Sequence, residues 1–169
     1  GPSAETMRRL GDKITSKLIA EAARVPVSPW SGGPVQRLEL PDLAKRIGFP
    51  VMLKATAGGG GRGIRMLREG DDLNAAFDSA QAEAANAFGD GTLFVEKTIS
   101  GARHVEVQMA ADRHGTVLAL GLRDCSVQRK HQKVVEEGPP PGLSPALMRQ
   151  LREASIRLLR EASYRGVAT

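Results

Sequence analysis

A run of four glycines constrains the fold of this chain more than any other feature. The segment Lys54–Gly63 reads Lys-Ala-Thr-Ala-Gly-Gly-Gly-Gly-Arg-Gly. It follows an apolar stretch and precedes Ile64–Leu67, and both flanks have the composition of short strands. Consecutive glycines remove every Cβ, so that backbone N–H groups can approach phosphate oxygens closely. The segment therefore predicts a phosphate-covering loop that joins two strands.

Two familiar glycine-loop patterns do not fit this context. Gly58, Gly60 and Gly63 satisfy GxGxxG, but the dinucleotide-binding motif requires a helix directly after the loop, where a strand is predicted. A Walker A loop would close on Gly-Lys-Ser/Thr, which does not occur here. The strand-loop-strand context is that of a glycine flap, with Lys54 at its base and Arg62 at its tip as phosphate ligands. The alternative is a flexible hairpin without function.

Hydrophobic periodicity and turn signals predict the elements around the loop. Helical spacing of apolar residues indicates two short helices in residues 4–24 that meet near Gly11. Further helices are expected at 41–47, 71–88 and 145–163, and strands at 50–55, 64–67, 92–97, 104–109 and 116–120. We expect the last three strands to be neighbours in one antiparallel sheet.

Charge and composition narrow the classes of partner. The chain has 169 residues, a formal charge of +5 and a pI near 9.8, which suit a nucleic acid, a membrane surface or a small polyanion such as a nucleotide. The basic groups lack interleaved aromatic residues that could stack on bases, and no apolar run is long enough for a membrane span. The single cysteine, Cys125, predicts a reducing, cytoplasmic compartment. We therefore expect a nucleotide partner, no nucleic acid and no membrane.

The segment Arg123–Lys133, called the basic strip below, concentrates positive charge. Strand alternation would place Arg129, His131 and Lys133 on one face, where they could converge on one anion. Lys133 would stabilise an anionic substrate or the charge that develops during phosphoryl transfer. The alternative is an exposed charged edge that discourages aggregation. Cys125, inside the strip, is expected to be a small buried residue rather than a reactive thiol.

Two other segments could contact a ligand. Strict alternation after Arg103 places His104, Glu106 and Gln108 on one polar face, which could line a cleft, and the intervening apolar side chains on a core face. A lone histidine on a strand is more often structural than ligand-binding, so the residues alone do not assign His104 a role. In Phe94–Lys97, the backbone could present donor and acceptor groups to an adenine edge.

Five segments, taken in order, closely resemble the biotin carboxylase component of biotin-dependent carboxylases. They are Gly1–Lys13, Lys54–Gly63, Phe94–Lys97, Arg103–Gln108 and Arg123–Glu137. The tryptophan-containing segment Val25–Gly33 looks most like the acetyl-CoA and acyl-CoA carboxylase branch. The resemblance implies an α+β, ATP-grasp fold, in which two subdomains hold ATP between them. It also implies a reaction in which ATP and bicarbonate give carboxyphosphate, which then carboxylates biotin on a carrier protein.

The resemblance further implies roles for individual residues. The positions that match the family's ATP site are Lys13, Lys54, Gly60, Gly61, Glu96, Lys97, Ile99, His104, Gln128 and His131. Lys133 matches the bicarbonate-binding lysine and is the catalytic candidate. The implied partners are ATP, bicarbonate, a biotin carboxyl carrier domain and a carboxyltransferase, and the resemblance is compatible with a homo-oligomer.

The resemblance also divides the chain and sets its expected extent. Residues 1–35 would form a helical segment and linker, 36–98 the lid subdomain with the glycine loop, and 99–169 the first part of the C-terminal subdomain. Only the central portion of a biotin carboxylase is matched, so the Mg²⁺ carboxylates and the catalytic arginine are expected outside this chain. No metal ligand is assigned within it. We expect the chain alone to bind nucleotide weakly and to turn over nothing.

Two other hypotheses stay open at this point. Another ATP-grasp ligase, such as a carbamoyl-phosphate synthetase, would share the fold and the acyl-phosphate chemistry, although the basic strip argues against it. A non-catalytic nucleotide-binding module is the other hypothesis, because the metal ligands are expected elsewhere.

Overall fold

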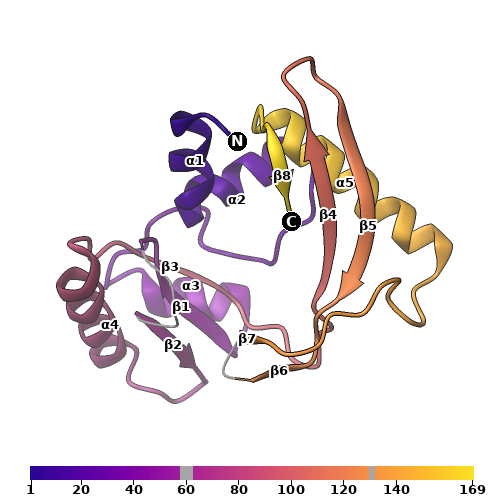
Figure 1. Cartoon of the computed structure of the whole chain (residues 1–169). Coiled ribbons are helices and arrows are strands. Elements are labelled where there is room, and N and C mark those ends of the chain that lie inside the picture. Colours follow the sequence, from indigo (N-terminus) through magenta and orange to yellow (C-terminus); the bar gives the residue numbers. More distant parts are fainter. Residues whose placement is uncertain (58–62, 130–131) are drawn as a thin grey trace. The chain divides into compact units, whose positions relative to one another are not determined.

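The computed structural model describes residues 1–57, 63–129 and 132–169 of the chain (Figure 1). Its elements in chain order are α1 (Ala4–Gly11), α2 (Lys13–Ala22), α3 (Leu40–Ile47), β1 (Val51–Ala55), β2 (Ile64–Leu67), α4 (Leu73–Phe88), β3 (Leu93–Lys97), β4 (Val105–Ala111), β5 (Val117–Asp124), β6 (Gln128–Arg129), β7 (Gln132–Lys133), α5 (Pro145–Glu161) and β8 (Gly166–Ala168). None of the helices in the described ranges combines the length and apolar character needed to cross a bilayer.

The chain divides into two compact units, and each is described by itself. Unit 1 comprises Gly1–Leu10, Ile19–Pro26 and Gly101–Thr169. Unit 2 comprises Gly11–Leu18 and Val27–Ser100.

Unit 2 is built on a three-stranded antiparallel sheet in the order β2-β1-β3. In the central strand β1, Val51 and Leu53 are fully buried while Lys54 is half-buried, as expected for a strand with two unlike faces. The helix α4 packs against β1 and β2 and contributes Phe77 to the same core. Fully burying a side chain of this size contributes about 1.5–3 kcal/mol, so this core fixes where the end of β1 lies.

Local signals explain where the helices of unit 2 begin and end. The side chain of Asp72 accepts a hydrogen bond from the backbone N–H of Ala75 and caps α4. Gly89 ends the helix in the left-handed conformation at φ 74°, which glycine adopts without a Cβ clash. Pro41 occupies the first turn of α3, where its missing N–H costs no helical hydrogen bond.

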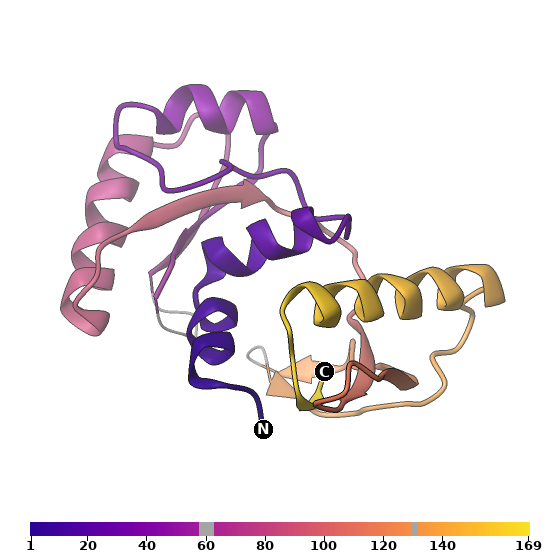
Figure 2. The ribbon, with the colours of Figure 1, turned by 90° about the horizontal axis from the view of Figure 1, so that it is seen from above.

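Unit 1 is a second antiparallel sheet, in the order β5-β4-β8, with α5 along one face (Figures 1 and 2). Its core contains Val107 and Met109 of β4, Leu122 of β5 and Leu159 of α5. The register between β4 and β5 shifts at Gln108/Met109, which marks a β-bulge. A short hairpin of β6 and β7 follows β5 along the chain.

Most of the expected elements are present, but the expected sheet is wrong. The paired helices before Arg24, the strands that flank the glycine run and the final helix all occur. The strands at 92–97, 104–109 and 116–120 do not form one sheet, because β3 pairs with β1 while β4 pairs with β5. The other edge of β3 is occupied by an isolated bridge between Trp30 and Glu96, which leaves no room there for β4. The strand β8 was not predicted.

Candidate functional site

The first group of predicted site residues lies in unit 2, at the end of β1. The Lys54 ammonium forms an ion pair with the Glu96 carboxylate, with 2.5 Å between Nζ and Oε1. Lys54 and Glu96 come from adjacent antiparallel strands, and their side chains are 28% and 13% exposed. Lys54 is the penultimate residue of β1, the strand that precedes the glycine run in the sequence.

Lys13 reaches the same end of β1 from helix α2. Its Nζ donates to the backbone oxygen of Thr56 at 3.2 Å. Burial and then the positive charge of Lys54 lower the pKa of Lys13, while Asp12 opposes the shift. The two ammonium groups are therefore close enough to repel each other, and an anion placed beside them would relieve that repulsion.

The Glu96 carboxylate has a second cationic partner that the sequence did not reveal. The Lys17 ammonium lies 2.7 Å from Oε2 of Glu96. Burial alone would raise the pKa of Glu96, but the hydrogen bonds and charges of Lys17 and Lys54 outweigh burial, so its pKa lies below the ordinary value. Lys17 follows Lys13 by one helical turn, and that i, i+4 spacing is the signal that could have identified it.

The remaining residues of the predicted adenine-contacting segment are anchored within unit 2. The Lys97 ammonium donates to the backbone oxygens of Gly48 and Phe49, at 2.7 and 2.8 Å. The backbone N–H of Lys97 donates to the oxygen of Pro29 at 2.8 Å. Ile99 follows β3 and is 63% exposed, so it offers an apolar surface at the end of the strand.

The second group of predicted residues lies in unit 1, around the carboxylate of Glu106. Glu106 is only 8% exposed and binds both the Lys133 ammonium and the Arg123 guanidinium. The contact between Arg123 and Oε1 is a charge pair without hydrogen-bond alignment. Arg123 also binds the carboxylate of Glu136. The polar face expected on this strand therefore exists, but Glu106 is a buried ion-pair centre rather than a solvated side chain.

These contacts shift the pKa values of Glu106 and of its neighbours Lys133 and Cys125. Burial alone would raise the pKa of the Glu106 carboxyl, but hydrogen bonds from Lys133 and Cys125 and the adjacent cations lower it overall. The hydrogen bond to Glu106 raises the pKa of Lys133. Burial and the neighbouring Glu106 raise the pKa of the Cys125 thiol, which is fully buried. Lys133 is thus a persistent cation, and Cys125 is a buried neutral thiol, as the unreactive interpretation expected.

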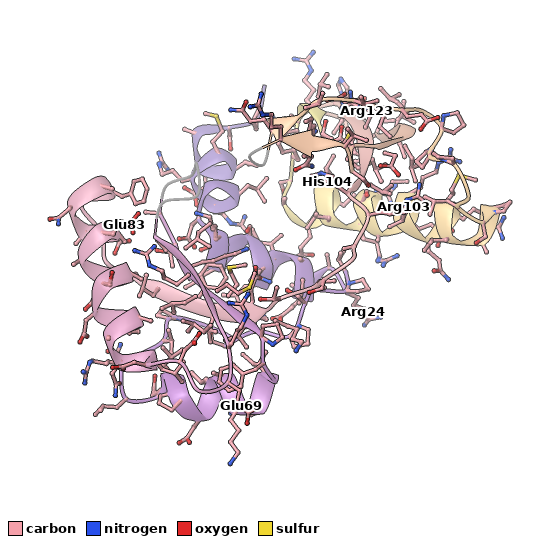
Figure 3. All side chains as sticks on the ribbon, turned by 90° about the horizontal axis from the view of Figure 1, so that it is seen from below. Arg24, Glu69, Glu83, Arg103, His104 and Arg123 are labelled. Atoms are coloured by element: carbon pink, nitrogen blue, oxygen red, sulfur yellow. The ribbon has the colours of Figure 1, made fainter. Side chains whose placement is uncertain are left out.

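His104 and Gln128 join this group through a direct hydrogen bond. Nε2 of Gln128 lies 2.9 Å from Nδ1 of His104 and 2.8 Å from the backbone oxygen of Cys125. An amide donor at Nδ1 leaves the proton of a neutral His104 ring on Nε2. Figure 3 shows His104 and Arg123 in unit 1, where they lie just before β4 and near the end of β5.

The predicted convergence of the basic strip is wrong for Arg129. The strip is not one strand, because β6 and β7 pair with Gln128 opposite Lys133 and Arg129 opposite Gln132. Directly opposed residues share a face of a hairpin, so Lys133 shares its face with Gln128 and not with Arg129. Gly60, Gly61 and His131 lie outside the described residues, and their roles stay predictions.

The group of potential metal ligands found among the described residues does not suit Mg²⁺. Among residues 1–57, 63–129 and 132–169, ligand atoms of Glu106, Cys125 and Glu136 lie within 4.8 Å of one another. Both carboxylates already bind cationic side chains, and the third ligand is a buried neutral thiol. Mg²⁺ requires an octahedral set of oxygen ligands, which this group does not provide.

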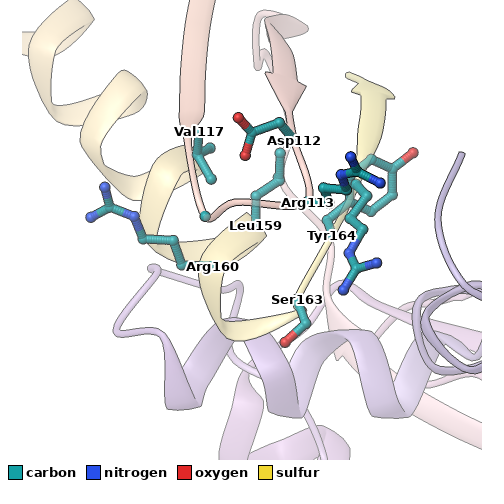
Figure 4. A pocket seen from close by; sticks show the side chains of 9 residues that line it. Asp112, Arg113, Val117, Leu159, Arg160, Ser163 and Tyr164 are labelled. Carbon is teal, nitrogen blue, oxygen red and sulfur yellow. The ribbon is translucent and has the colours of Figure 1, made fainter.

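A pocket of about 200 Å³ lies at the other end of unit 1 (Figure 4). Its lining includes Asp112 and Arg113 after β4 and Leu159 and Tyr164 near the end of α5. None of the predicted site residues lines it, since His104 precedes β4 and the pocket follows that strand.

Comparison with known proteins identifies the family. Residues 12–169 match the family described as carbamoyl-phosphate synthase L chain, ATP binding domain. Biotin carboxylase of Halalkalibacterium halodurans is 44% identical over 170 residues, a match that covers 100% of this chain and 38% of that protein. Mitochondrial pyruvate carboxylase of Homo sapiens is also 44% identical, with 100% of this chain and 14% of that protein covered.

Solved structures give the same result for the fold. The biotin carboxylase complex with β-γ-ATP from Campylobacter jejuni matches with a TM-score of 0.93 and 45% identity, covering 99% of this chain and 38% of that one. The biotin carboxylase domain of Hydrogenobacter thermophilus 2-oxoglutarate carboxylase matches with a TM-score of 0.91 and 40% identity, covering 99% and 37%. The chain therefore belongs to the carbamoyl-phosphate synthase L chain ATP-binding domain family, with the α+β, ATP-grasp fold of the biotin carboxylases it resembles.

Proposed function

We propose that this chain is the ATP-binding central portion of a biotin carboxylase, which uses ATP and bicarbonate, through carboxyphosphate, to carboxylate biotin on a carrier protein. The observation that carries most weight is the pair of ammonium groups, Lys13 and Lys54, held near the end of β1, the strand that precedes the glycine run. The 45% identity to a biotin carboxylase whose structure contains an ATP analogue supports a nucleotide as the anion.

In unit 2, the proposed roles follow from charge and position. Lys13 and Lys54 bind phosphate oxygens, which relieves the repulsion between the two ammonium groups. Gly60 and Gly61 cover the phosphates with backbone N–H groups. Glu96, Lys97 and Ile99 lie at the adenine end, where the exposed Ile99 side chain offers an apolar contact for the base.

In unit 1, Lys133 is proposed to position bicarbonate and the transferring phosphoryl group. Its pKa is raised by Glu106, so it acts as a fixed positive charge and not as a proton acceptor. His104, Gln128 and His131 are proposed nucleotide contacts. Mg²⁺, when bound to the nucleotide, would neutralise phosphate charge. Its protein ligands belong to segments beyond the described residues.

The sequence and the relatives point to different final acceptors and cellular settings. The segment Val25–Gly33 favours the acetyl-CoA carboxylase branch, whereas pyruvate carboxylases are among the relatives at 43–44% identity. A carboxyl carrier domain and a carboxyltransferase are the partners that either branch requires. A cytoplasmic location rests on the single cysteine, and some relatives are named mitochondrial or chloroplastic.

A carbamoyl-phosphate synthetase is the second candidate, because the matching family carries that name. Both candidates bind ATP and bicarbonate, so nucleotide binding does not separate them. In the whole protein that contains this chain, stimulation of bicarbonate-dependent ATP hydrolysis by free biotin would favour biotin carboxylase, and stimulation by ammonia would favour the second candidate.

Calorimetric titration of the chain with ATP and with AMP tests the core of the proposal. We expect ATP to bind more tightly than AMP, and Lys54→Met to weaken ATP binding at least about tenfold, as for loss of a charged hydrogen bond. Lys45→Met is the matched control, since Lys45 is exposed on α3 and has no ion pair among the described residues. Equal loss in both variants, or equal affinity for ATP and AMP, would contradict the proposal.

A further inference from the structure

Lys17 is the second cation on the partly buried Glu96 carboxylate. Its Nζ lies 2.7 Å from Oε2 of Glu96, while the Lys54 ammonium binds Oε1. The Lys17 side chain is only 16% exposed, so this is not a solvated surface pair. All three side chains belong to unit 2, in the first part of α2, in β1 and in β3.

The surroundings of Lys17 hold it at Glu96. Nζ of Lys17 lies 5.4 Å from the centroid of the Trp30 ring, a cation–π distance. It also donates to the hydroxyl oxygen of Ser28 at 3.2 Å, and that hydroxyl donates to Oε2 of Glu96 at 3.3 Å. Trp30 in turn meets the buried Phe94 ring edge-on, with 6.2 Å between centroids. Lys17 is thus fixed on three sides, whereas Lys54 is the more exposed of the two lysines.

The charges of Lys17, Lys54 and Glu96 determine whether Lys54 can leave the carboxylate for a phosphate. If Lys54 turns from Glu96 to a phosphate, the carboxylate keeps one counter-ion only because Lys17 is present. A carboxylate of such low exposure without a partner is strongly destabilised. Without Lys17, Glu96 would therefore compete with the phosphate for the Lys54 ammonium.

We propose that Lys17 is a positioning residue for nucleotide binding, which neutralises Glu96 and so releases Lys54 to bind phosphate. The inference rests on the proposed function, because it takes Lys54 as a phosphate ligand. Lys17 itself does not contact the nucleotide in this account, since Trp30 and Ser28 hold its ammonium at Glu96. The effect of Lys17 must then depend on the negative charge of Glu96.

A double-mutant comparison tests that dependence. The chain and the variants Lys17→Met, Glu96→Gln and Lys17→Met/Glu96→Gln are titrated with ATP, with Trp30, the only tryptophan, as the fluorescent probe. We expect Lys17→Met to weaken ATP binding roughly 3- to 10-fold, the range for one partly buried charge interaction. In the Glu96→Gln background the same substitution should change the affinity by less than about twofold, because no negative charge is left to hold Lys54.

Four further variants complete the test. Lys17→Arg should restore near-normal affinity, since it keeps the charge at Glu96, and Lys45→Met should have no effect. If Lys17→Met does not fold, judged by circular dichroism, Lys17→Gln replaces it in both backgrounds. Equal losses with and without the Glu96 charge would overturn the inference, because Lys17 would then act on the nucleotide directly or on the fold. No loss in Lys17→Met would also overturn it. If Lys54→Met leaves affinity unchanged, the proposed function itself fails.

Discussion

The two units each contain a carboxylate of low exposure held between two cations, but the two clusters differ in their charge. In unit 2, Glu96 lies between Lys17 and Lys54. In unit 1, Glu106 lies between Arg123 and Lys133, but Glu136 adds a second negative charge. The unit 1 cluster is therefore balanced, whereas the unit 2 cluster has one excess positive charge and has Lys13 beside it. A polyanion such as a triphosphate therefore suits the unit 2 cluster better than the unit 1 cluster.

Removing one lysine from each cluster tests which of the two clusters binds the triphosphate. Lys54→Met should weaken ATP binding at least about tenfold, because it removes a charged donor from the unbalanced cluster. Lys133→Met should weaken ATP binding by the chain less than about threefold, because the Lys133 charge is already satisfied by Glu106. Calorimetric titration of both variants measures the contrast. A larger effect from Lys133 would show that the triphosphate is centred on unit 1.

Replacing the carboxylate at the centre of each cluster should destabilise the chain to different extents. We expect Glu106→Gln to lower the free energy of unfolding by about 2 kcal/mol and Glu96→Gln by about 1 kcal/mol. Glu106 is the less exposed residue and interacts with Lys133, Cys125 and the Arg123 charge, so more groups lose a partner. Urea unfolding followed by circular dichroism gives both values. The controls are Glu153→Gln on α5 and Glu69→Gln, two exposed residues without ion pairs among the described residues. The order Glu96 above Glu106 would contradict this account.

Acid should weaken both clusters in the same direction. The pKa values of Glu96 and Glu106 are lowered in the folded chain, so their contribution is present above the ordinary value of 4.5 and is lost as the pH falls through the folded value. Asp124 extends this loss of stability to lower pH, since hydrogen bonds from Ser126 and then Arg103 lower its pKa to about 2. Stability measured between pH 6 and about pH 2 should fall steadily, and the Glu106→Gln variant should show a shallower slope. An unchanged slope would contradict the role of Glu106.

High pH should destabilise the unit 1 cluster through Lys133. The raised pKa of Lys133 means that its contribution is fully present below the ordinary value of 10.5 and is lost as the pH rises through the folded value. Unfolding experiments with the chain and Lys133→Met should therefore differ in slope only above about pH 10. A slope difference near neutral pH would show that Lys133 titrates there and is not a persistent cation.

The smallest expected effect concerns the thiol of the unit 1 cluster. Cys125 is fully buried and its pKa is raised, so the native chain should react with a thiol reagent at least about tenfold more slowly than the unfolded chain. Absorbance of the released reagent measures both rates. Rapid reaction of the native chain would show that the cluster around Glu106 opens readily.

Local patterns in the sequence predicted the helices and strands well and the pairing of the strands poorly. The strands that flank the glycine run and the capped helix α4 follow from composition and from Asp72 and Gly89. The pairing of β3 with β1 does not, because both β3 and β4 alternate as strands and only the packing of Trp30 against β3 separates them. Periodicity describes one segment, whereas sheet order depends on segments distant in the chain.

The same limit applies to the candidate site. Lys54 was identifiable from its place before the glycines, and Lys133 from the resemblance to biotin carboxylases. Alternation placed Glu106 on a polar face, but its burial depends on Arg123 and Lys133 folding over it from later segments. Arg129 was misplaced because β6 pairs antiparallel with β7, which sets Arg129 opposite Gln132 and Lys133 opposite Gln128.

Nuclear magnetic resonance of the lysine side chains tests whether ATP draws Lys54 away from Glu96 while Lys17 stays in place. ATP is titrated into the ¹⁵N-labelled chain, and the ammonium signals of Lys54 and Lys17 are assigned from the corresponding methionine variants. We predict that the Lys54 signal shifts in a saturable way as its ammonium moves to phosphate, while the Lys17 signal keeps the signature of its contact with Glu96 and Trp30. Saturable binding of ATP that leaves Lys54 unshifted, or no saturable binding, would contradict the account.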